Sequence, residues 1–309
     1  MKFRTNKKRG AAALITAATL TLALLFTACP NNAGGSGGTT PPTDKTYTVG
    51  GVQFTMKGIA AVTNGTVGYS GKSDNAPHTV SLSAYRIGET EVTQELWQAV
   101  MGTNPSYFSG SPEGGEVQGK RPVENVNWYK CIAFCNELTK KVPELGESQC
   151  VYTYNGNTYN STDAGAQRVP AINMSKKGFR LPTEAEWEWA AMGGTNDKWA
   201  GTNVQGQLVN YAWYDANSGE KTHQVKLKTA NGYGLYDMSG NVWECCWDRY
   251  GSFSYPLSPD YAGAASGDDR VFRGGSCNLF AAVAARAYRD HFGPVYHSIL
   301  FGLRLVSRP

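Results

Sequence analysis

Helical periodicity is confined to three short segments of this 309-residue chain, and this limits the folds it can adopt. Apolar residues recur at helical spacing from Glu91, and again after Asn127, which can cap a helix. Thr183 and Glu186 form a capping box at the start of the third segment, which a pair of glycines ends. The remainder is rich in glycine and has only short runs typical of strands. The pattern predicts an α+β fold with two to three helices, short strands and much irregular coil.

The first 28 residues have the three-part pattern of a secretory signal. Basic residues precede an apolar run over residues 11–26, which is short for a membrane span. The run ends in Leu25-Phe26-Thr27-Ala28-Cys29, which is similar to a bacterial lipobox, although Phe26 is larger than the residue usual there. We predict a lipoprotein signal peptide over residues 1–28 and a lipidated Cys29. The alternative is cleavage by ordinary signal peptidase after Ala28.

Loss of the predicted signal changes the charge of the chain. The sequence has 29 Lys and Arg against 25 Asp and Glu; five basic residues leave with the signal, so 24 face 25, a formal charge of −1. This balance does not favour nucleic-acid binding. Residues 29–45 are mostly Gly, Ser, Thr, Pro and Asn, which predicts a flexible tether. Residues 46–309 contain no repeat and no second linker, and we expect one domain in the cell envelope, lipid-anchored on the outer-membrane surface.

Six further cysteines follow Cys29, at positions 131, 135, 150, 245, 246 and 277. Outside the cytoplasm they could form disulfides, and the sequence cannot choose among the pairings. Cys131 and Cys135 lie four positions apart on the apolar face of the second predicted helix. That placement favours buried free thiols.

Several segments follow one another in an order typical of one protein family. They are residues 85–93 (YRIGETEVT), 178–188 (GFRLPTEAEWE), 234–244 (GLYDMSGNVWE), 273–276 (RGGS) and 302–306 (GLRLV), with Arg289 before the last. These segments resemble the hallmarks of the formylglycine-generating enzyme (sulfatase-modifying factor) family, whose fold is an elaborated C-type lectin fold. The resemblance extends from about residue 47 to the end of the chain. It implies this fold, with Trp243 in the core and Gly275 in a backbone conformation that strains other residues.

The resemblance also bears on catalysis. The family's enzymes oxidise a substrate cysteine with oxygen, using two active-site cysteines that bind copper. The corresponding positions after the Gly-Gly-Ser turn hold Leu279 and Ala284, and neither supplies a thiolate. We predict no catalysis and no catalytic cofactor; an enzyme of the sulfatase-modifying family is the alternative. Glu184, Glu186 and Glu188 could form a carboxylate cluster, but we interpret them as a helix cap and a solvated helix face.

A structural calcium ion is one further implication of the resemblance. Calcium-binding members use a side chain, two carbonyl groups and a glutamate within the second long motif. By position these are Asp237, the carbonyls of Gly240 and Val242, and Glu244. Oxygen ligands of this kind suit a hard cation. In the alternative interpretation, Asp237 caps a turn and Glu244 pairs with a nearby arginine.

The C-terminal segment has a restricted amino-acid alphabet. Residues 271–309 contain no Glu, Gln, Lys, Met or Trp, although these five types number 53 in residues 1–270. Randomising the adenines of an asparagine codon that ends in a pyrimidine excludes the same five types. Diversity-generating retroelements mutagenise their variable proteins in this way, and the chain resembles such proteins of the spirochaete (treponemal) lipoprotein type. The alternative is ordinary drift of an enzyme-family C-terminus, with some of these residues packed.

We therefore expect a variable ligand-binding region over residues 271–306. Fixed family positions alternate there with a mixture of aromatic, polar and aliphatic residues, which a buried core would not accept without partners. The predicted ligand-binding residues are Cys277, Asn278, Leu279, Phe280, Val283, Tyr288, Asp290, His291, Phe292, Tyr296, His297 and Ser298. The expected partner is an unknown protein or glycan at a cell or host surface, since a site built to vary has no sequence signature for its target.

Overall fold

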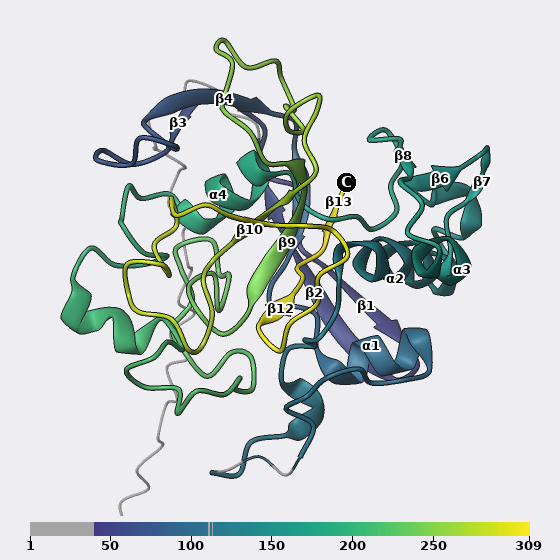
Figure 1. Ribbon diagram of the computed structural model, residues 1–309, viewed down its shortest axis with the longest axis horizontal. Coiled ribbons are helices and arrows are strands. Elements are labelled where there is room, and N and C mark those ends of the chain that lie inside the picture. The colour runs from purple at the N-terminus through teal and green to yellow at the C-terminus, as the bar shows by residue number, and fades with distance from the viewer. Residues whose placement is uncertain (1–39, 111, 113) are drawn as a thin grey trace, which may run out of the picture. The chain divides into compact units, whose positions relative to one another are not determined.

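The computed structural model describes residues 40–110, 112 and 114–309; the predicted signal peptide and Cys29 lie outside this part. Its strands form two four-stranded sheets and two smaller sheets, joined by long irregular connections (Figure 1). This arrangement confirms the predicted α+β class with few helices and much coil. Among the described residues, no helix is both long enough and apolar enough to cross a bilayer.

One sheet brings the two ends of the domain together. Its strand order is β1-β2-β5-β13, and the strands are β1 (Lys45–Val49), β2 (Val52–Ile59), β5 (Tyr85–Gly88) and β13 (Val306–Ser307). All three pairings are antiparallel. The backbone of Val306 also exchanges two hydrogen bonds of 2.8 Å with Arg180. The C-terminal strand is thus held between the first part of the domain and the central family motif.

The other large sheet carries the predicted variable region. Its order is β11-β10-β9-β12, with β9 (Trp243–Arg249), β10 (Arg270–Arg273), β11 (Asp290–Phe292) and β12 (Phe301–Gly302). Only β12 is parallel to its neighbour. The smaller sheets are β3 (Val62–Val67) with β4 (His78–Leu82), and β6 (Tyr152–Tyr154) between β7 (Asn157–Thr158) and β8 (Ala171–Ile172). The positions predicted to vary therefore lie on an edge strand and in the loops on both sides of it.

The helices are α1 (Gln94–Met101), α2 (Trp128–Lys141), α3 (Ser161–Gly165) and α4 (Glu184–Met192). Both predicted caps are confirmed: Asn127 accepts the amide of Lys130, and Thr183 with Glu186 forms the capping box. The first helix begins at Gln94 rather than Glu91, because the Thr93 side chain caps it. Helix α3 was not predicted, because its single turn is too short to show helical periodicity.

Two clusters of aromatic and aliphatic side chains form most of the core. In the larger one, Trp97 of α1 stacks on Phe134 of α2 with ring centroids 4.7 Å apart. Trp243 is 2% exposed in the same cluster, which confirms its predicted core position. The thiols of Cys131 and Cys135 are buried and free, as predicted.

Candidate ligand-binding surface

Buried ion pairs attach the C-terminal segment to α4. Glu184 and Glu188 are 3% and 2% exposed. Arg273 donates to both carboxylates, at 2.9 and 2.7 Å, and Arg289 donates twice to Glu184, at 2.6 and 2.8 Å. Arg286 donates to Glu188 at 2.8 Å. The prediction that these glutamates form a solvated helix face is therefore wrong.

Charge pairing is what allows these carboxylates to be buried, because an isolated ion in the interior is very costly. Burial alone would raise the pKa of Glu188, but the guanidinium groups of Arg273 and Arg286 hold it below its usual range. Both arginines also donate to backbone carbonyls, Arg273 to that of Arg286 at 2.6 Å and Arg286 to that of Asp197 at 2.7 Å. The segment from β10 to β11 is thus connected to α4 at three arginines.

A signal for this burial is present in the sequence of α4. Trp187 and Trp189 lie on opposite sides of the helix, and both are buried. A helix with an aromatic residue on each side leaves no face for solvent. Glu186 is buried as well, where it caps the Thr183 amide at 2.9 Å and pairs with Arg180 at 2.6 Å. Its predicted capping role is confirmed.

The glycine turn after β10 is determined by close backbone packing. Gly275 has a φ of +74°, which most side chains disfavour. A Cβ at this position would lie 3.0 Å from the Cα of Ala284 and 3.1 Å from the carbonyl carbon of Val283. Both observations confirm the prediction for Gly275. They also show that the loop following the turn folds directly back on it.

The predicted ligand-binding residues differ in their exposure. Asn278, Phe280, His291, Tyr296 and His297 are exposed; Leu279, Tyr288, Asp290, Phe292 and Ser298 are partly buried; Cys277 and Val283 are buried. Phe280 and Tyr296 are 61% and 63% exposed, which is unusual for large aromatic side chains. These five exposed side chains, which we call the exposed set, are the part of the predicted site that a ligand can reach directly.

Two predicted contact residues belong to the interior instead. The Cys277 amide donates to Asn241, its carbonyl accepts the Ser218 hydroxyl at 2.5 Å, and burial raises the pKa of its thiol to about 12. Val283 packs in the larger core cluster, because the glycine turn draws its backbone inward. The prediction of both as contact residues is therefore wrong. A thiol with so high a pKa is also a poor nucleophile and metal ligand at neutral pH.

The partly buried aromatics connect the core to the surface. The ring centroid of Tyr288 lies 6.2 Å from that of Trp243. The ammonium group of Lys72 lies 4.4 Å from the centroid of the Tyr288 ring. Phe292 packs edge-on against Phe272 at 5.2 Å and against Phe301 at 4.5 Å. Replacing either ring would disturb packing as well as any contact with a ligand.

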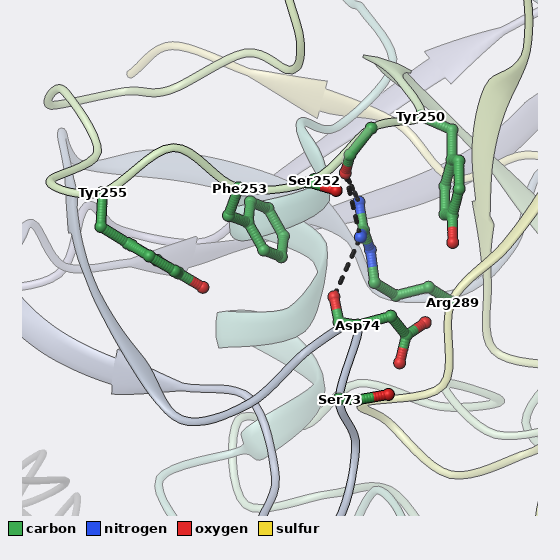
Figure 2. Close-up of a pocket in the computed structure, with 8 residues that line it drawn as sticks. Ser73, Asp74, Tyr250, Ser252, Phe253, Tyr255 and Arg289 are labelled. Carbon is green, nitrogen blue, oxygen red and sulfur yellow. Dashed lines mark hydrogen bonds between the residues drawn. The ribbon is translucent and has the colours of Figure 1, made fainter.

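His291 lies at the end of a stack that continues into a small cavity. Its ring stacks on Tyr250 at 4.0 Å. Behind that ring the Arg289 guanidinium lies between Tyr250 and Phe253, 4.7 and 4.3 Å from their centroids (Figure 2). The cavity of about 170 Å³ is lined by Ser73, Asp74, Tyr250, Gly251, Ser252, Phe253, Tyr255 and Arg289. Arg289 donates to Glu184 and to the carbonyls of Asp74 and Gly251, so the protein itself satisfies this cation.

The carboxylate predicted to bind calcium has other partners. Glu244 accepts from Arg304 at 2.7 to 3.0 Å with both oxygens, and one oxygen also accepts the indole N–H of Trp187 at 2.6 Å. Asp237 accepts the amide of Lys226 with one oxygen, and its other oxygen has no hydrogen-bond partner among the described residues. In the described part of the chain, no three His, Cys, Asp or Glu side chains gather as metal ligands would. The Glu244 contacts fit the arginine alternative and do not fit a calcium ligand; calcium binding itself stays an untested prediction.

The comparisons with known proteins identify the family. A family model described as the sulfatase-modifying factor enzyme 1-like domain matches residues 39–309, and the chain belongs to this family. Its structure is similar to that of Treponema denticola variable protein 1, with 54% identity and a TM-score of 0.79 over 87% of this chain and 100% of that one. These findings confirm the predicted family and fold, and they confirm that the chain resembles a treponemal variable protein.

Curated relatives of known name cover much of the chain as well. The formylglycine-generating enzyme of Streptomyces coelicolor is 38% identical over 255 residues, which are 71% of this chain and 78% of that protein. The protein named chaperone protein LppX of Paenibacillus barcinonensis is 36% identical over 213 residues, which are 61% of this chain and 70% of that protein. The family thus includes enzymes, so the function of this member has to be inferred from the residues of its own site.

Proposed function

We propose that this chain is a surface-displayed protein that binds a ligand through its C-terminal side chains, performs no catalysis, and is diversified by a retroelement. One observation carries the proposal: the exposed set lies on, or directly after, a backbone segment that three buried arginines attach to α4. Such a segment can change its surface side chains without losing its conformation. The similarity to a treponemal variable protein supports the same function.

The chemistry of the exposed set suits recognition of a macromolecule. Phe280 and Tyr296 offer large apolar area, and surfaces with such exposed aromatics are typical of binding sites. Asn278, His291 and His297 add hydrogen-bonding groups that suit different partners. The ligand class is an unknown protein or glycan at a cell or host surface, and nothing in the site favours nucleic acid.

The enzymatic alternative lacks its reactive groups. Leu279 is partly buried against the core, and Ala284 is 1% exposed with its carbonyl accepting the Ser239 hydroxyl at 2.8 Å. Neither side chain has a copper ligand, so the residues at these positions do not fit that metal. The buried Cys277 thiol does not replace them. We therefore propose a binding role rather than formylglycine generation.

Sequencing of the gene's 3′ end and its flanking DNA tests the diversification. We expect a reverse transcriptase gene nearby and a near-copy of the 3′ end that differs only at adenines. Variants within a cell population should change the codons of the exposed set and leave those of the buried Ala284, Ala285 and Ala287 unaltered. A missing near-copy, or changes spread evenly over exposed and buried codons, would contradict the proposal.

We also propose that lipid attached to Cys29 anchors the chain to the outer-membrane surface, with the residues between Cys29 and β1 as the tether; the predicted tether boundary at residue 45 is one residue too far, because Lys45 already pairs in β1. The motivation is the lipobox-like sequence before Cys29. Replacing Cys29 by Ala should move the protein from the membrane fraction into soluble fractions, because it loses its acyl chains. Ser36→Ala, in the same segment, is the matched control. Protease treatment of intact cells checks the surface location, and a Cys29→Ala protein that stays in the membrane fraction would refute the anchor.

A further inference from the structure

We propose that Tyr107, which lies outside the variable region, is a fixed contact residue of the same ligand surface, and that the ligand is a protein. This inference rests on the proposed binding function. Tyr107 is 67% exposed, more than any other large hydrophobic side chain in the described residues. An aromatic ring so exposed needs an explanation, and its loop and its neighbours supply one.

The loop that carries Tyr107 is held by an unusual number of hydrogen bonds. The amides of Tyr107 and Phe108 donate to the buried carboxylate of Glu124, at 3.0 and 2.9 Å. The carbonyl of Phe108 accepts from the side chains of Gln94 at 3.2 Å and Gln118 at 2.6 Å. The loop backbone is therefore ordered before any partner arrives. A rigid aromatic side chain loses little conformational entropy on binding, which favours a contact role.

Asn125, which follows Glu124, also binds the loop that carries Tyr296 and His297 and holds it next to the loop of Tyr107. Asn125 donates its side-chain amide to the carbonyl of Pro105 at 2.9 Å, on the Tyr107 side. Its backbone amide donates to Ser298 at 2.8 Å, and its side-chain oxygen lies 2.8 Å from a ring nitrogen of His297. One asparagine thus connects the loop of Tyr107 to the loop of Tyr296 and His297. These contacts make the two loops neighbours on the surface.

The shape of this surface favours a protein over a small ligand. Tyr107 and Tyr296 project into solvent, and two cavities of the described residues, around Arg289 and around Tyr154, are lined by other side chains. Projecting aromatic rings fit the pockets of a partner protein, and tyrosine is enriched at such interfaces. A fixed tyrosine next to variable positions would provide contact area that does not depend on the variant.

A display experiment tests this role with defined probes. Codons of the exposed set are randomised in the full chain, which is displayed by mRNA display and selected on lysozyme, serum albumin and ubiquitin, and in parallel on glycan-coated beads. Tyr107→Ala and Tyr107→Phe are then introduced into binders for each probe. Tyr154→Ala on β6 is the matched control, because it removes the same ring from the separate β6–β8 sheet. Thermal melts of each variant verify that it is folded.

We expect Tyr107→Ala to weaken binders of at least two probes by about 30-fold or more, the size of a hot-spot contact. Tyr107→Phe should restore most of the affinity, and Tyr154→Ala should leave it unchanged. Binders of every probe that tolerate Tyr107→Ala would overturn the inference and leave the proposed binding function intact. A folded library without binders would overturn both. Tyr107-dependent binders obtained only on glycan-coated beads would overturn the assignment of a protein ligand.

Discussion

Replacing Glu188 by Ala is expected to lower the free energy of unfolding by about 3–5 kcal/mol, the usual cost of removing one partner from a buried ion pair. Glu188 is 2% exposed and accepts from Arg273 and Arg286 at 2.7 and 2.8 Å. Without it, Arg286 loses the carboxylate that pairs with it, and Arg273 keeps only Glu184, which it shares with Arg289. The loss should also loosen the segment between β10 and β11, which carries Asn278 and Phe280 of the exposed set.

Thermal denaturation measures this effect, and the melting temperature should fall by on the order of 10 °C. Glu147→Ala is the control, since that glutamate is exposed and its replacement should leave the melting temperature nearly unchanged. Amide exchange should become faster in residues 286–291 of the Glu188 variant. An unchanged melting temperature would show that Arg273 and Arg286 bind water or other groups instead, and that their ion pairs with Glu188 do not stabilise the C-terminal segment.

Replacing Arg304 by Met should destabilise the fold by a similar amount, about 3–5 kcal/mol, and more strongly at high pH than at low pH. Arg304 is fully buried and is the guanidinium partner of Glu244. Glu91 and Asp237 lie close by. Burial raises the pKa of Glu91 well above its usual range and that of Asp237 to about 6, and Arg304 lowers both.

The sign of the pH dependence follows from these shifts. A carboxyl group whose pKa is higher in the folded state favours folding when protonated, and this contribution is lost as the pH rises through the folded pKa. Removing Arg304 raises the folded pKa of Glu91 and Asp237 further. The deficit of the variant should therefore grow as the pH rises from about 6 to about 8 in parallel melts, because Asp237 ionises there when Arg304 is present. Lys45→Met, which breaks an exposed ion pair with Glu144, is the control; a deficit independent of pH would contradict the explanation.

Local sequence signals predicted the elements that depend on local interactions. The caps at Asn127 and Thr183 act within a few residues of their own position, so the sequence shows both the donor and the acceptor. Gly275 was predictable for a different reason: its family motif marks a turn, and its positive φ is a property of the local backbone. The one-turn helix α3 was missed, although Asn160 and Asp163 form a capping box there.

Contacts between distant parts of the chain could not be predicted from such signals. The spacing of Glu184 and Glu188 suggested a solvated face, but their partners lie 85 to 105 positions away. The sequence also did not predict which residues of the predicted variable region are exposed. The restricted alphabet includes both the exposed Phe280 and the buried Val283. Tyr107 lies next to the loop of Tyr296 and His297 because Asn125, which belongs to neither loop, binds both of them.

The sequence by itself determined the family, the fold class, the helix caps and the set of residues from which a binding surface could be built. Composition and motif order carry that information because they record local conformational preference and shared ancestry. Only the tertiary structure decided which of these residues face solvent and which glutamates are buried. Burial depends on packing between segments far apart in the chain, and a charged side chain can enter the interior only where such packing brings it an opposite charge.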